Sequence, residues 1–113
     1  MVRDNKLQEA PPFEVERVMK ALGENLRTAR LRRNMTIEEV AERIGTGPRA
    51  VMNAERGKPS TGLVVYTALL WLYGLLDQFE ELADPTQDEE GLTLESIRAR
   101  TRVRKGQELD GDF

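Results

Sequence analysis

The sequence predicts an all-α fold, and three features of its pattern support that prediction. Apolar residues recur at a helical spacing of three or four across 13–29. A helix-capping pattern, Thr36 followed by Glu39, then opens a second periodic stretch. Glycine and proline occur where helices would end and begin, as at Gly45. Five helices joined by short turns are therefore expected between residues 13 and 83.

The first of these helices is expected to begin near Phe13. It follows a polar stretch, residues 1–12, that we interpret as a flexible N-terminal extension. The apolar residues of the helix continue as far as Ala29. Gly23 lies inside this stretch, so the pattern leaves open whether it forms one bent helix or two.

Two short helices around a tight turn are expected next, over about residues 36–57. The capping box opens the first, and Gly45 ends it by adopting the left-handed conformation. Pro48 suits the first position of the following helix, where its missing N–H is no loss. With Val51 and Ala54 turned inward, one polar side of this helix faces outward. The outward residues are Pro48, Arg49, Met52, Asn53 and Arg56. This is the pattern of a helix-turn-helix, whose second helix enters the DNA major groove.

An uncharged segment from Pro59 to Leu76 follows. Its apolar part begins at Leu63 and is shorter than the roughly 20 residues that a membrane span requires. A helix that is apolar on every side must be covered on every side, and a domain this small covers only one. We therefore predict a homodimer in which a second copy covers the other side. The predicted seam comprises Trp71, Leu72, Leu75, Leu76 and Phe79; Trp71 is expected in the core or in the seam.

The C-terminal part is predicted to be less regular. A second short helix over 75–83 is expected to stop before an acidic linker and a basic arm, 84–105. Residues 97–104 alternate small or apolar residues with arginine, a period of two that suits an edge strand or an extended arm. That arm has three open interpretations: a DNA contact, a strand capping the dimer, or a contact with a partner protein. Residues 106–113 are expected to be disordered.

Composition excludes several classes of function. Cysteine and histidine are absent from all 113 residues, which excludes zinc fingers, disulfide frameworks and thiol- or histidine-based catalysis. The acidic residues lie in solvated runs instead of a convergent pocket, so we expect no enzyme, no metal and no cofactor. No apolar signal stretch follows Met1, and we expect a cytoplasmic protein without a membrane segment.

The net charge of −3 conceals segregated blocks. Residues 23–59 carry eight basic and five acidic groups, a local charge of +3. Residues 77–95 hold eight acids and no base, and 96–105 hold five bases and no acid. The local charge of a domain matters more than the total. A nucleic-acid-binding surface is therefore compatible with the acidic pI near 5.1.

Three runs of sequence resemble the Xre family of phage Cro and repressor proteins. They are 26–30 (LRTAR), 35–45 (MTIEEVAERIG) and 51–58 (VMNAERGK), within a resemblance that covers about residues 22–83. The later runs LWLYGLLD and LADP, with the arginine-alternating end, resemble HipB-type antitoxins more narrowly. The resemblance implies a dimeric λ-repressor-like DNA-binding domain that represses its own operon beside a HipA-type kinase toxin.

The family pattern also implies roles for individual residues. Thr36 and the helix start at Ile37 would meet a phosphate, and Arg49 and Asn53 would read guanine and adenine in a palindromic operator. Arg30 and Glu55 match a structural ion pair. The full DNA-binding set implied is Thr36, Ile37, Thr46, Pro48, Arg49, Met52, Asn53, Arg56 and Lys58. Arg32 and Arg33 are interpreted as a solvated face in preference to phosphate contacts.

Two other functions remain open from the sequence. One is a phage or mobile-element repressor without a toxin partner, and the other is a non-catalytic protein-interaction module. A neighbouring toxin gene would separate the first from the antitoxin. Salt dependence of DNA binding would separate the second, because binding that releases counterions weakens steeply as salt rises.

Overall fold

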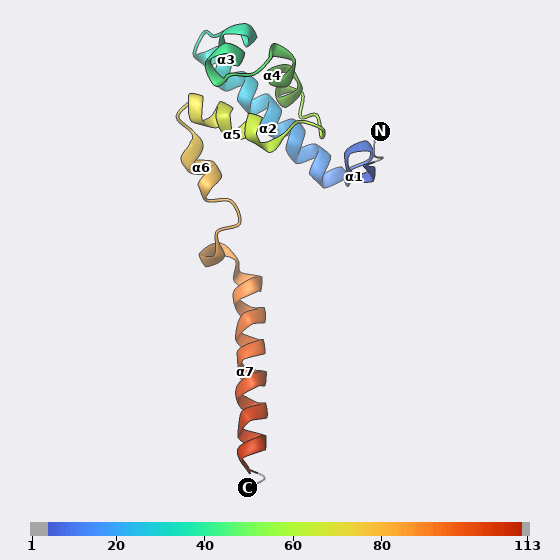
Figure 1. Cartoon of the computed structure of the whole chain (residues 1–113), viewed down its shortest axis with the longest axis vertical. Coiled ribbons are helices and arrows are strands. Elements are labelled where there is room, and N and C mark those ends of the chain that lie inside the picture. The colour runs from blue at the N-terminus through green and yellow to red at the C-terminus, as the bar shows by residue number, and fades with distance from the viewer. Residues whose placement is uncertain (1–4, 112–113) are drawn as a thin grey trace. The chain divides into compact units, whose positions relative to one another are not determined.

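A computed structural model describes residues 5–111 of the chain, with side chains as far as Gln107 (Figure 1). Helices and connecting turns account for these residues, and no strand occurs among them, so the all-α prediction is confirmed. The chain divides after Phe79 into two units. The elements are α1 (Lys6–Glu9), α2 (Phe13–Arg32), α3 (Ile37–Ile44), α4 (Pro48–Glu55), α5 (Leu63–Leu72), α6 (Leu76–Glu80), a 3-10 turn η1 (Pro85–Gln87) and α7 (Glu89–Gly111).

The hydrophobic core of the first unit joins α2, α3, α4 and α5. Its largest fully buried side chains come from four different helices, because each helix turns its apolar side inward. They are Leu26, Val40, Val51 and Leu69. Around them α3 packs against α4 and α5, while α4 also packs against α2 and α5. This packing holds α3 and α4 in a fixed crossing, which positions the outer side of α4.

The backbones of α2 and α4 approach each other closely at Gly23. The first helix is continuous through Gly23, which settles the question of one helix or two. A Cβ atom at Gly23 would lie 2.5 Å from the carbonyl oxygen of Glu55 and 2.8 Å from that of Ala54. The glycine therefore lets the C-terminal turn of α4 rest directly on the backbone of α2.

We expect Gly23→Ala to destabilise the first unit by roughly 1–3 kcal/mol, because the added methyl group forces two backbones apart. The higher helix propensity of alanine offsets only about 1 kcal/mol of that cost. Thermal unfolding followed by circular dichroism measures the effect. Gly106→Ala in α7 is the control, because a Cβ atom there meets nothing within 4 Å. Equal melting temperatures for Gly23→Ala and the wild type would contradict the close approach.

The two sides of α5 have different environments. Tyr66, Leu69 and Leu70 are buried in the first unit, whereas Leu63 and Val64 are exposed. The predicted seam residues divide between the two environments. Trp71 and Leu76 are exposed, so Trp71 is not a core residue. The other three are partly buried and pack against their own core: Leu72, Leu75 and Phe79.

The predicted extended arm is wrong, because residues 98–105 lie inside the helix α7. Asp88 begins this helix by accepting a hydrogen bond from the N–H of Gly91 at 2.9 Å. Two glutamates follow in the first turn, where the helix dipole favours negative charge. The arginines and Ala99 are strong helix formers. A period of two suits a strand only if another strand can pair with its N–H and C=O groups, and a helix satisfies those groups locally.

The structure also differs from the expected ends of the chain. The helix α7 continues to Gly111, inside the segment expected to be disordered, and residues 112–113 lie outside the described range. The short helix α1 lies inside the expected flexible extension, with Asn5 as its N-cap. The expected helix over 75–83 is shorter, α6, and the linker contains η1. None of the described helices is long and apolar enough to cross a membrane.

Candidate nucleic-acid interface

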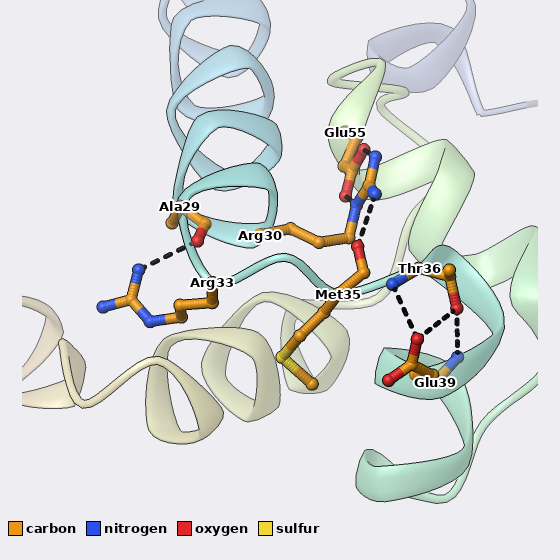
Figure 2. A network of polar contacts seen from close by, with 7 residues as sticks. All are labelled: Ala29, Arg30, Arg33, Met35, Thr36, Glu39 and Glu55. Atoms are coloured by element: carbon orange, nitrogen blue, oxygen red, sulfur yellow. Dashed lines mark hydrogen bonds and ion pairs between the residues drawn. The ribbon is translucent and has the colours of Figure 1, made fainter.

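The start of α3 is formed by the capping box that the sequence predicts (Figure 2). The side-chain hydroxyl of Thr36 accepts a hydrogen bond from the N–H of Glu39 at 3.1 Å. In return the Glu39 carboxylate accepts one from the N–H of Thr36 at 3.3 Å and one from its hydroxyl at 3.1 Å. Thr36 is exposed, so a rigid helix N-terminus with a positive dipole end faces solvent.

A tight turn then leads from α3 to α4. Gly45 adopts the left-handed conformation with φ 78°, and its N–H donates to the carbonyls of both Ala41 and Glu42 at the end of α3. Gly47 is the N-cap of α4, and Pro48 is its first residue. Thr46 is half-buried and donates its N–H to the carbonyl of Ala41 at 2.9 Å. The turn therefore has the glycine and proline chemistry that the sequence indicates.

The helix α4 has one buried side and one outward side. Val51, Ala54 and Glu55 are buried against the other helices. Arg49 and Arg56 are exposed, as are Pro48 and Lys58, while Ile37, Met52 and Asn53 are half-buried. The residues of α4 that the sequence assigns to DNA therefore lie on its outward side, at the surface, because the apolar residues fill the opposite side.

Arg30 holds α2, α4 and the loop before α3 together (Figure 2). Its guanidinium donates to Glu55 through Nε at 2.7 Å and through Nη2 at 3.0 Å. A third hydrogen bond, from Nη1, reaches the carbonyl oxygen of Met35 at 2.9 Å. The two side chains are only 9% and 6% exposed. Their hydrogen bond raises the pKa of Arg30, against the opposing effect of burial.

Arg33 is exposed, and its guanidinium also makes two hydrogen bonds within the first unit. Its guanidinium donates to the carbonyl oxygen of Ala29 at 2.9 Å and to that of Tyr73 at 2.8 Å. It also lies over the Tyr73 ring, 5.2 Å from the ring centre. Burial, with a smaller contribution from the charge of Glu55, raises the pKa of Tyr73 to about 12. Arg33 thus ties the end of α2 to the end of α5, and both Arg32 and Arg33 are exposed.

A hollow beside the outward side of α4 brings in one cation that sequence reasoning missed. It is lined by Arg27 and Arg56, by Ile37 and Met52, and by the Arg30–Glu55 pair at its base. Arg27 lies one helical turn before Arg30 on α2, and this spacing could have indicated it. The hollow therefore combines two exposed arginines with apolar side chains next to the start of α3.

Among residues 5–111 no cluster of three or more acidic side chains could hold a metal ion. The arrangement offers hydrogen-bond donors, positive charge and a helix with an outward polar side. These groups suit contacts with a nucleic acid. These two helices, their turn and the outward side of α4 define a helix-turn-helix protein.

Comparison with known families assigns the chain to a particular helix-turn-helix family. A family model described as a helix-turn-helix domain, of the Xre/Cro-like type, matches residues 21–83. That range covers more than half of the 113 residues, and the chain belongs to this family. Such a domain is typical of DNA-binding regulators. No curated protein and no solved structure matches the chain.

Proposed function

We propose that this protein is a homodimeric, sequence-specific DNA-binding transcriptional repressor of the cytoplasm. The observation that carries the proposal is the outward side of α4. Arg49, Asn53 and Arg56 lie there on a helix whose position is held by the Arg30–Glu55 pair and by the packing of α3. A recognition helix must present its side chains at a fixed angle, and this scaffold provides that angle.

The side chains on this surface divide by their chemistry into two roles. Arg49 can donate two parallel hydrogen bonds to guanine, and the amide of Asn53 can pair with adenine. Met52 and Pro48 offer apolar surface, which suits a thymine methyl group. The N-terminus of α3 at Thr36, together with Lys58 and Arg56, would contact phosphates, which position the protein without reading sequence.

A second copy is proposed to pair through the exposed side of α5. Leu63, Val64 and Trp71 lie on that side, with Trp71 about two turns after Val64, and Trp71 is 61% exposed. Thr67 lies between them, yet its hydroxyl already bonds the carbonyls of Leu63 and Val64 at 3.2 and 2.9 Å. This side therefore presents apolar surface, and a two-fold axis through it would pair two recognition helices for half-sites about 34 Å apart.

Arg49→Ala is expected to weaken binding to an operator selected from random DNA by about 1–3 kcal/mol and to relax preference at one base position per half-site. Lys58→Ala should instead weaken all DNA sequences alike and lower the salt dependence by about one released ion. Gel shifts on operator and random duplexes at several salt concentrations measure both. If the two variants lost affinity equally on both DNAs, α4 would not be the recognition helix.

An antitoxin role remains a narrower proposal. It depends on the resemblance of residues 70–77 and 82–85 to HipB-type antitoxins, while the arginine-alternating end is helical here. The neighbouring open reading frame tests it: a HipA-type kinase gene, whose product co-purifies with this chain, is the expected result. A neighbouring gene of another kind would favour the repressor without a toxin partner.

A further inference from the structure

The helix α7 presents its side chains to solvent over four turns. Every residue from Leu92 to Gln107 is exposed, including Leu92 (50%) and Val103 (61%). Most of the stability of a helix in a protein comes from the packing of an apolar face against a neighbour. Two pairs within it add repulsion, because Arg98 and Arg102, and likewise Arg100 and Arg104, are like charges four residues apart. The helix therefore needs a partner that covers apolar surface and supplies negative charge.

One stripe along α7 has the spacing of a helix-pairing seam. Leu92, Ser96, Ala99 and Val103 follow one another at intervals of four, three and four residues, which keeps them on one side of the helix. The small side chains of Ser96 and Ala99 leave a shallow hollow in its middle, bordered by Val103 and Arg100. A large residue at each end and small residues in the middle allow two such helices to approach closely.

The charge distribution decides the direction of pairing. Residues 88–95 carry four acids and no base, and residues 98–105 carry five bases and no acid. A parallel pair would set like blocks against each other, whereas an antiparallel pair sets each acidic block against a basic one. Alignment of Leu92 with Val103 of a second copy also aligns Ser96 with Ala99. Glu95 and Arg102, which border one further hollow on the flank of the stripe, then face each other across the seam twice.

We infer that α7 is a self-association helix, which pairs antiparallel with α7 of a second copy of this chain through Leu92, Ser96, Ala99 and Val103. A nucleic acid is the less suitable partner for two reasons. The basic side chains divide between two opposite sides of the helix, Arg98, Arg102 and Lys105 on one and Arg100 and Arg104 on the other. The acidic block would also repel phosphate. The inference goes beyond DNA binding and depends on α7 alone.

The absence of cysteine makes disulfide trapping a direct test, because only introduced thiols can react. Full-length Leu92→Cys and Val103→Cys variants, one of them carrying a size tag, are unfolded together, refolded and oxidised. Antiparallel pairing brings these two positions within the 4.4–6.8 Å Cα separation that a disulfide requires, so the mixed disulfide is expected as the main product. In that arrangement residue 92 of one copy lies about 16 Å along the helix axis from residue 92 of the other copy, and the same holds for residue 103.

A matched control uses the opposite side of the same helix. Leu94 and Thr101 have the same register across the antiparallel pair as Leu92 and Val103, but both point away from the seam. The Leu94→Cys and Thr101→Cys mixture should form its mixed disulfide about tenfold more slowly, since only facing thiols gain effective concentration. Dimerisation through α5 alone would raise the rate of mixed-disulfide formation equally in both mixtures. This control therefore distinguishes pairing through α7 from pairing through α5.

Charge reversal gives a second readout. Glu95→Arg and Arg102→Glu should each slow the trapping of the Leu92→Cys and Val103→Cys mixture, and the double reversal should restore the rate. A disulfide of Leu92→Cys with itself as the main product would show parallel pairing and overturn the inference. Equal trapping rates in the seam and control mixtures would overturn it as well.

Discussion

Glu55→Ala is expected to destabilise the first unit by about 3–5 kcal/mol, because it leaves the buried guanidinium of Arg30 without its counter-charge. The carbonyl of Met35 would remain as a hydrogen-bond acceptor, but it carries no full charge. A loss of that size should lower the melting temperature by more than about 10 °C. Thermal unfolding by circular dichroism, at a fixed protein concentration, measures it.

Two further variants make this result specific. Glu14→Ala removes the acid of an exposed pair on α2, Glu14 with Arg17, whose side chains are 71% and 57% exposed. Such a pair contributes at most about 1 kcal/mol. Glu55→Gln keeps the shape and part of the hydrogen bonding and should fall between Glu55→Ala and the wild type. A melting temperature of Glu55→Ala equal to that of Glu14→Ala would show that the Arg30–Glu55 pair contributes little.

Trp71→Glu is expected to open the proposed α5 seam and to weaken dimerisation, while each copy stays folded. Tryptophan at the centre of an interface contributes about 2 kcal/mol or more, a factor of roughly 30 in the dissociation constant. The variant also sets a carboxylate against its own symmetry mate in a poorly hydrated seam. Because Trp71 lies outside the core, the helical content should remain. Sedimentation equilibrium and operator gel shifts measure both consequences, and affinity for the full operator should fall with the loss of the second half-site.

Phe13→Glu is the matched control for this experiment. Phe13 is an exposed aromatic residue at the start of α2, away from α5 in the sequence, and its change leaves the proposed seam intact. A clean wild-type monomer of 12.8 kDa at micromolar concentration, in sedimentation equilibrium, would rule out the dimer. Substitution of Leu72 or Leu75 is a poorer test than Trp71→Glu. Both residues pack against the core of their own chain, so a charge there would act on folding itself.

Several features of this fold could be predicted from the sequence because they depend on residues close together in the chain. The capping box needs only Thr36 and Glu39, and the turn between α3 and α4 needs only Gly45, Gly47 and Pro48. The outward side of α4 follows from its own apolar spacing. Local hydrogen bonds and helical periodicity determine the capping box, the turn and the outward side of α4. The helix-turn-helix could therefore be predicted from the sequence.

Other features were decided only by contacts between distant residues. Nothing near Gly23 in the sequence indicates that the carbonyl of Glu55 will rest on it, and nothing near Arg33 indicates Tyr73. The almost entirely apolar sequence of α5 does not indicate which side is buried. Packing against the other helices of the first unit determines the buried side. The arginine alternation in α7 is compatible with a strand or a helix, and a strand has nothing to pair with among the described residues. Sequence by itself therefore determined the local helices and their caps, while the choice of partners came from tertiary structure, because burial and backbone hydrogen bonding depend on neighbours that the sequence does not place.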